Sequence, residues 1–453
     1  MEIIKGASSV FSKLIGKQEI VAGTRYRPIS FLIFADDAGT KLVYNTFTNM
    51  FSRINEEETG VLKGSIPVDI DRDRKLIENW FLISQDNDDY DLCEQTRALI
   101  KFVTSAGKPK YDSYTILTTT DCNARCFYCY QFGRDNSRAH MSTQTAADVA
   151  EFIIRNSDPK QPTHITWFGG EPLYNDKVID IICNRLTERG MRFSSSMISN
   201  GYLLSQDVVD KAINKWNLKS VQIPLDGTEV VYNKVKAYIY RDDPNPYKRV
   251  ISNIKTALDG GLKVVARVNV DNHNLDDIFS LAKELASHFA SYKKFHIYCH
   301  VLYENAGAKL IQRNDLERMK LAEDLIKFEE YCNSLGIFSS RSVPDYFRTV
   351  ACAADNPHAV CIGPDGRLGL CSHVMATDTF GSIYTDEEDI ALLDSWRKYI
   401  NCKDLCNGCP FVPVCLRVER CSEKGSAPCD ESYKKQKMHH FVAAMLRDNK
   451  TEN

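Results

Sequence analysis

The sequence has no long apolar run, no strong excess of charge of either sign and no recognisable export signal. Across its 453 residues, no stretch approaches the roughly 20 apolar residues that a membrane-spanning helix needs. The formal net charge of −3 gives no broad basic surface, so we expect neither nucleic acid nor an acidic membrane as a partner. Residues 1–6 lack the basic and apolar regions of a signal peptide, and we therefore expect a cytoplasmic protein.

Cysteine, in contrast, is abundant and unevenly placed. The chain has 16 cysteines, and an intracellular setting disfavours disulfides, so metal or redox chemistry is the better interpretation. Nine of them lie between Cys352 and Cys429, and three more form a compact triad. The remaining cysteines are expected to be ordinary core or surface residues: Cys93, Cys183, Cys299 and Cys332.

The triad is Cys122, Cys126 and Cys129, spaced Cys-x3-Cys-x2-Cys. Three thiolates are one short of a closed site, because structural zinc and a saturated four-iron cluster each take four protein ligands. The triad therefore predicts a [4Fe–4S] cluster with one iron left open for a further ligand. The alternative, three unrelated cysteines in a loop, is disfavoured by the tight spacing.

A βα alternation runs from residue 111 to about residue 301. Short runs rich in β-branched residues alternate with helix-length stretches, which predicts a parallel sheet, open or partly closed like an incomplete barrel. Before it, we expect two strands and a helix at 29–35, 41–44 and 46–58, then a helix at 92–103. The six strands are expected at 114–119, 164–168, 193–198, 220–225, 263–270 and 295–301.

Polar or glycine-rich motifs follow the first four of these strands. The triad follows the first strand, Gly-Gly-Glu-Pro at 169–172 the second, Ser-Asn-Gly at 199–201 the third and Asp226-Gly227 the fourth. In parallel α/β folds the chemistry lies beyond the carboxyl ends of the strands. The four motifs are therefore expected to converge on one site.

The triad after a first strand, with Gly-Gly-Glu-Pro after the second, resembles the radical S-adenosylmethionine (radical SAM) superfamily. The resemblance implies that SAM binds the open iron and is cleaved to a 5′-deoxyadenosyl radical, which takes a hydrogen from the substrate. It implies that Glu171 meets the SAM amino group and that Arg267 or Asn269 pairs with its carboxylate. One departure is Pro224, where many relatives have serine. The full set of implied SAM contacts is Tyr128, Gly169, Gly170, Glu171, Ser199, Asn200, Asp226, Arg267 and Asn269.

The C-terminal cysteines resemble the SPASM extension of radical SAM enzymes, which holds two auxiliary [4Fe–4S] clusters. The alternative is a zinc module, but the second Cys-x2-Cys pair of a zinc ribbon is missing. Asp365-Gly366 is expected to form a hairpin turn that places Cys371, and Cys402 is spare. The implied ligand sets are Cys352, Cys361, Cys371 and Cys421 for one cluster, and Cys406, Cys409, Cys415 and Cys429 for the other.

The expected fold class is α/β. It comprises a partial (β/α)6 TIM-like barrel, a small N-terminal α+β region and a cysteine-rich SPASM extension. The predicted domains are an N-terminal region at 1–107, the barrel at 108–310, a helical linker at 311–345 and the SPASM domain with a C-terminal helix at 346–453. The N-terminal region either binds a leader peptide by strand addition or packs on the barrel.

The resemblance implies an enzyme that holds SAM and three [4Fe–4S] clusters, and that needs a reductant such as flavodoxin or ferredoxin. SPASM enzymes mostly modify peptides, so we expect a maturase that forms a thioether or carbon–carbon cross-link in a ribosomally made precursor. One alternative is a sulfatase-maturing enzyme, disfavoured because Ser372 and not aspartate follows Cys371. Another is an iron–sulfur electron carrier, which needs no Gly-Gly-Glu-Pro motif. The candidate catalytic bases are His373, Asp365 and Tyr303.

Overall fold

The computed structural model of the chain describes residues 1–131, 138–271, 274–302, 313–337, 343–344, 346–421 and 429–451. The chain divides into two compact units. Unit 1 comprises Met1–Gly107, Ser340–Ala351 and Lys398–Asn453, and unit 2 comprises Lys108–Ser339 and Cys352–Arg397. Within the described ranges, no helix is both long and apolar enough to cross a membrane.

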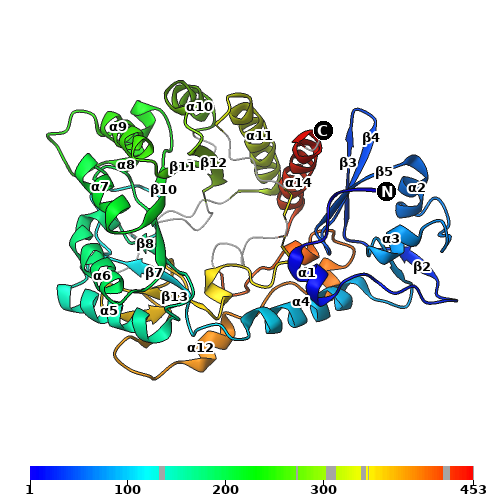
Figure 1. Cartoon of the computed structure of the whole chain (residues 1–453). Coiled ribbons are helices and arrows are strands. Elements are labelled where there is room, and N and C mark those ends of the chain that lie inside the picture. The colour runs from blue at the N-terminus through cyan, green and yellow to red at the C-terminus, as the bar shows by residue number, and fades with distance from the viewer. Residues whose placement is uncertain are drawn as a thin grey trace. The chain divides into compact units, whose positions relative to one another are not determined.

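Unit 2 is built on the six parallel strands that the sequence predicts. Each strand pairs in parallel with the next along the chain. They are β7 (Ser113–Leu117), β8 (Thr163–Phe168), β9 (Phe193–Ile198), β10 (Leu218–Pro224), β11 (Lys263–Val270) and β12 (Phe295–Val301). Helices cover the outer side of this curved sheet (Figure 1): α5 (Thr143–Asn156), α6 (Asp176–Glu188), α7 (Gln206–Asn214), α8 (Glu229–Lys236), α9 (Pro246–Asp259) and α10 (Leu275–Phe289).

The sheet continues past β7 and stays open. β13 (Ala359–Ile362) pairs in parallel with β7, and β14 (Arg367–Gly369) and β15 (Thr379–Ser382) follow as antiparallel strands. The strand order is β12-β11-β10-β9-β8-β7-β13-β14-β15, so β12 and β15 are the two edges. The expected incomplete barrel is confirmed. The predicted turn at Asp365-Gly366 joins β13 to β14, with Gly366 at φ +83°.

The two faces of the strands differ in burial, as β11 shows. Val264, Ala266 and Val268 are fully buried in the core beneath the helices. Val265 and Arg267 are only partly buried, and because side chains alternate along a strand they lie on the opposite, inner face. The inner face of the open barrel is therefore the face available to ligands.

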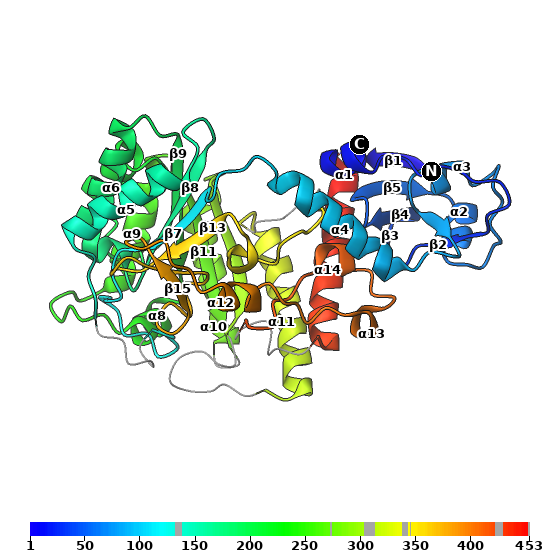
Figure 2. The same cartoon turned by 90° about the horizontal axis from the view of Figure 1, so that it is seen from below.

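Unit 1 contains a four-stranded antiparallel sheet of order β1-β5-β4-β3, drawn in blue in Figure 2. Its strands are β1 (Glu2–Lys5), β3 (Leu32–Asp37), β4 (Thr40–Asn45) and β5 (Met50–Ile54). The C-terminal helix α14 (Glu431–Thr451) packs on one face, where Phe441 and Met445 meet Ile33 and Tyr44. The long helix α4 (Asp89–Ser105) adds Cys93 and Ile100 to a second apolar cluster.

The remaining elements are short, apart from α11. In unit 1, strands β2 (Tyr26–Pro28) and β6 (Leu82–Ser84) pair antiparallel. The other helices of the described chain are α1 (Ser9–Leu14), α2 (Glu56–Leu62), α3 (Arg74–Glu78), α11 (Asp315–Ser334), α12 (Ile390–Ser395) and α13 (Lys403–Cys406), with 3-10 turns η1 (Pro172–Asn175), η2 (Ala353–Asp355) and η3 (Val412–Val414).

The helix expected at 46–58 is wrong. The side chain of Asn45 accepts hydrogen bonds from the backbone N–H groups of Phe47 (2.9 Å) and Thr48 (3.4 Å), and Asn49 takes a left-handed φ of +64°. This turn reverses the chain, so the next residues pair with β4 as strand β5. Only then does helix α2 begin, at a capping box between Asn55 and Glu58.

Candidate functional site

The triad lies on the loop that follows β7, as the sequence predicts. The backbone N–H of Ala124 approaches the sulfur of Cys122 to 3.3 Å, and the N–H of Cys129 donates to the carbonyl of Cys126 at 3.1 Å. Burial raises the pKa of Cys122 to about 12, and the charges of Glu171 and the neighbouring thiols add to this. Such thiols ionise readily only when a bound cation compensates them, so their chemistry suits a metal cluster.

The two glycines after β8 hold this loop by backbone contacts. The N–H of Gly170 donates to the carbonyl of Thr119 and the N–H of Glu171 to that of Asp121, both at 3.0 Å. A Cβ on Gly169 would lie 2.2 Å from the Thr119 oxygen, and one on Gly170 would lie 2.2 Å from the Asp121 oxygen. Gly169 also has a φ of +141°. Only glycine therefore lets the two loops lie this close.

Glu171 joins the end of β8 to the end of β9. Its carboxylate is fully buried and accepts hydrogen bonds from the Ser199 hydroxyl (2.8 Å) and from the backbone N–H groups of Asn200 (2.7 Å) and Leu173 (3.1 Å). Burial raises the pKa of Glu171 to about 7, although these hydrogen bonds act against the rise. A buried carboxylate of this kind is suited to receive an ammonium group.

Asn200 connects this carboxylate to the triad loop. Its side-chain amide donates to the side chain of Asn123 at 2.6 Å and lies 3.8 Å from the sulfur of Cys122. The structure thus brings together three of the predicted motifs, at the carboxyl ends of β7, β8 and β9.

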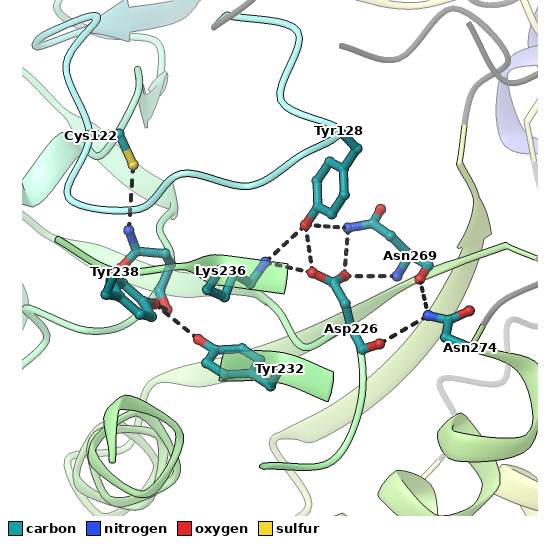
Figure 3. Close-up of polar contacts among 9 residues, drawn as sticks. Cys122, Tyr128, Asp226, Tyr232, Lys236, Tyr238, Asn269 and Asn274 are labelled. Atoms are coloured by element: carbon teal, nitrogen blue, oxygen red, sulfur yellow. Dashed lines mark hydrogen bonds and ion pairs between the residues drawn. The ribbon is translucent and has the colours of Figure 1, made fainter. Parts of the chain in front are cut away.

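The fourth motif is the centre of a buried polar network (Figure 3). The Asp226 carboxylate, after β10, accepts from the ammonium of Lys236 at 2.6 Å, the hydroxyl of Tyr128 at 2.5 Å and the side-chain amide of Asn269 at 2.8 Å. Lys236 also donates to the Tyr128 oxygen at 2.9 Å. Asn274 closes the network by donating to the backbone carbonyls of Asp226 and Asn269. Tyr128, Asp226 and Asn269, expected together from the sequence, are in contact.

Lys236 is the residue of this network that the sequence interpretation missed. It is 1% exposed, at the end of α8. Burial lowers its pKa, but the charge of Asp226 outweighs burial and holds the pKa well above its usual value. Its carbonyl accepts from the backbone N–H of Arg125, within the triad loop, at 2.7 Å. One signal was available, because Lys236 lies four residues after the buried Tyr232 and so on the same, inward face of α8.

The candidate bases lie in different surroundings. The ring of His373 stacks on that of Tyr130, the residue after the triad, with centroids 4.2 Å apart and planes 9° apart. Asp365 is half exposed in the β13–β14 turn and pairs with Arg367 at 2.6 Å. Tyr303 lies outside the described residues. Of the two described candidates, only His373 is given a contact with the triad loop.

The four cysteines Cys406, Cys409, Cys415 and Cys429 line one cavity in unit 1, with Tyr433 among its other walls. No three His, Cys, Asp or Glu side chains in the described chain lie close enough to hold a single metal ion. A four-iron cluster places each thiolate on a different iron, so its ligands need not meet at one point.

The other predicted ligand set divides between the units. Cys352, Cys361 and Cys371 belong to unit 2, and Cys421 belongs to unit 1. Burial raises the pKa of Cys361 well above its usual value, and the nearby thiol of Cys371 adds to the rise. Cys361 and Cys371 are thus neighbours, while the part of Cys421 in this set stays a prediction.

Residues 116–285, which span β8–β11 and most of α10, match the model of the Radical SAM superfamily. This segment is a radical SAM domain. It includes the triad, Glu171, Asn200 and the Asp226 network, and it makes the chain an enzyme. The superfamily assignment implies SAM and a [4Fe–4S] cluster as cofactors, and the arrangement of residues described above fits both.

Curated sequence relatives are named for nucleotide chemistry. A probable GTP 3′,8-cyclase of Sulfurisphaera tokodaii is 25% identical over 302 residues, which cover 62% of this chain and 84% of that protein. An S-adenosylmethionine-dependent nucleotide dehydratase of Pseudoalteromonas ulvae is 33% identical over 106 residues, covering 20% of this chain and 33% of that protein.

Solved structures share the fold over more of the chain. Native anSMEcpe with bound AdoMet, at 15% identity, covers 75% of this chain and 99% of its own, with a TM-score of 0.55. Streptococcus suis SuiB bound to S-adenosylmethionine, at 14% identity, covers 90% of this chain and 99% of its own, with a TM-score of 0.53. These likenesses establish the fold and extend it beyond the radical SAM domain.

Proposed function

We propose that this enzyme is a radical SAM maturase that forms a thioether or carbon–carbon cross-link in a ribosomally made precursor peptide. The observation that carries the proposal is the extent of the likeness to SuiB, which covers 90% of the chain. A related structure is that of SuiB bound to the precursor peptide SuiA, with a TM-score of 0.50. The four-cysteine cavity outside the radical SAM domain supports the proposal, because it suits one of two auxiliary clusters.

The residues have distinct parts in this proposal. Cys122, Cys126 and Cys129 hold the catalytic cluster, and bound SAM supplies the radical that removes a substrate hydrogen. Glu171 receives the SAM ammonium, with its oxygens already oriented by Ser199 and Asn200.

Lys236 supplies the buried positive charge for the SAM carboxylate. It is the cation nearest to the triad loop in the Asp226 network, and Arg267 is the alternative cation. His373, stacked on the residue after the triad, is the candidate base for a substrate proton. The sheet of unit 1, with β1 and β3 as its edge strands, is the candidate leader-binding surface.

A nucleotide is the second candidate substrate. The curated relatives named as GTP 3′,8-cyclases favour it, because one of them aligns with 62% of this chain. The peptide proposal is preferred because those relatives leave more than a third of this chain unmatched, whereas the SuiB fold covers 90% of it.

The test begins with the anaerobically reconstituted enzyme, reduced and given SAM. We expect 5′-deoxyadenosine, and we expect none from Cys126→Ala, which lacks a triad thiol. The short peptides encoded beside the gene, and GTP in parallel, are then offered as substrates and examined by mass spectrometry. Loss of two hydrogens from a peptide supports the proposal. Conversion of GTP with every peptide unchanged would replace it with the second candidate.

A further inference from the structure

Arg267 occupies a distinct place on the inner face of the barrel. It stands in β11 between Pro224 of β10 and Tyr298 of β12, which are its partners in the parallel register. Asn269, two residues further along β11, already contacts the Asp226 network at the SAM site. Since two residues of a strand span about 6–7 Å, Arg267 lies one step deeper in the barrel than that network.

The guanidinium of Arg267 has no partner among the described residues. Its Nε is buried, and no hydrogen bond or ion pair of the side chain is formed within the described ranges. This differs from Lys236, whose ammonium is paired with Asp226 and Tyr128. A buried donor left unsatisfied costs about 1–3 kcal/mol, and more when it is charged. Such a cost is tolerated where a ligand supplies the missing acceptor.

The neighbours of Arg267 cannot supply that acceptor. The oxygen of Gln222 already accepts the Tyr298 hydroxyl at 2.8 Å. Pro224 has no polar side chain. Asp226, the nearest carboxylate along β10, is saturated by Lys236, Tyr128 and Asn269. The acceptor therefore comes from outside the chain.

We propose that Arg267 binds a carboxylate of the substrate peptide, an Asp or Glu side chain or the terminal carboxylate. The inference rests on the proposed function. A planar guanidinium with several free N–H groups matches a carboxylate in a bidentate pair. Its single charge suits a monoanion, whereas a nucleoside triphosphate needs several cations. In strands β7–β12, which are all described, the other basic residues are Lys219 and Lys263, both at the amino ends of their strands.

The position of Arg267 gives this contact a purpose. A carboxylate held one step inside the SAM site fixes the peptide backbone beside it, and so determines which residue faces the radical. Arg267 is thus a specificity residue for the substrate and not a ligand of SAM.

The test uses a random peptide library displayed on its encoding mRNA. The reconstituted enzyme, immobilised with SAM, selects binders in four forms: wild type, Arg267→Gln, Arg267→Glu and the control Lys263→Gln, on the same strand but exposed. We expect wild type and the control to enrich Asp or Glu at one position or at the peptide terminus. Arg267→Gln should lose that enrichment, and Arg267→Glu should shift it to Lys or Arg. SAM affinity, measured by equilibrium binding, should stay within about twofold in Arg267→Gln.

Each other outcome overturns the inference in an identifiable way. The same acidic enrichment in wild type and Arg267→Gln would show that another residue reads the carboxylate. A fall of about tenfold or more in SAM affinity, with Arg267→Lys retaining it, would make Arg267 a SAM ligand. Binding of GTP by wild type but not by Arg267→Gln would make the ligand a phosphate. Retention of no peptide by wild type would overturn the proposed function as well. Thermal unfolding of each variant checks that it is folded.

Discussion

Asp226 and Lys236 show how a single buried pair organises the cofactor site. Their side chains are 2% and 1% exposed, and the contact is 2.6 Å long. Removing one partner of a buried pair leaves the other charge without compensation, which is more costly than losing a surface pair. The pair also joins α8 to β10, and the backbone bond from Arg125 to Lys236 links it to the triad loop.

Lys236→Met is therefore expected to destabilise the fold by about 3–5 kcal/mol, and to weaken SAM binding. Lys236→Arg should keep most of both, because it keeps the charge. The matched control is Lys211→Met, which breaks a half-exposed pair with Asp176 worth about 0–1 kcal/mol. The measurements are urea unfolding and equilibrium SAM binding. Equal losses in Lys236→Met and Lys211→Met would contradict this account.

Glu171 gives the chain a pH dependence of known sign. Its folded pKa of about 7 exceeds the ordinary 4.5, so between these values the folded chain holds a proton that the unfolded chain has released. Stability from this group is therefore present at low pH and is lost as pH rises to about 7, by roughly 3 kcal/mol in all. In the cluster-free chain, Glu171→Gln should remove this part of the slope. The comparison is urea unfolding of both forms at about pH 5 and about pH 8, and parallel slopes would refute it.

At the scale of elements, the site depends on two loops that touch through their backbones. The segment after β8 can approach the triad loop only because Gly169 and Gly170 have no side chains. The fit of the cluster loop is thus set by the neighbouring strand and not by the cysteines alone.

Gly170→Ala would place a methyl group 2.2 Å from the Asp121 carbonyl oxygen, where backbone must move. We expect a loss of about 1–3 kcal/mol from overpacking, and less iron bound at the triad after reconstitution. Gly6→Ala is the control, because nothing lies within 4 Å of its added methyl group. Iron per chain and the unfolding midpoint are the readouts. Full iron loading in Gly170→Ala would show that the loops can separate without harm.

At the scale of the whole molecule, the two kinds of cysteine set lie in different units. The triad belongs to unit 2, and the four-cysteine cavity belongs to unit 1. Their losses should therefore have different consequences for the reaction.

Cys409→Ala is expected to lose about four irons per chain, because a four-iron cluster needs its thiolates. It should lose product formation more completely than SAM cleavage. Cys126→Ala should lose both. Cys183→Ala, in the apolar core of unit 2, is the control and should keep its iron. Iron content and 5′-deoxyadenosine yield are measured together. Unchanged iron in Cys409→Ala would remove the auxiliary cluster from unit 1.

The sequence by itself determined the elements that depend on local pattern. The six strands and their helices follow from hydrophobic periodicity, and the motifs after β7, β8, β9 and β10 meet because parallel strands bring their carboxyl ends to one edge. Three strands, Phe193–Ile198, Lys263–Val270 and Phe295–Val301, have the predicted bounds. The N-terminal helix at 46–58 failed because the Asn45 side chain and the left-handed Asn49 make a turn that periodicity does not reveal.

Only the tertiary structure decided what depends on contacts distant in sequence. It placed Lys236 in the core of the cofactor site, because the Asp226 carboxylate and the end of α8 meet there. It left Arg267 on the inner face without a partner, which depends on three adjacent strands. It also grouped Lys398–Asn453 with the N-terminal sheet, through the packing of α14 on β3. Local sequence fixes which residues can form an element, whereas burial and charge pairing between distant elements fix what each residue does.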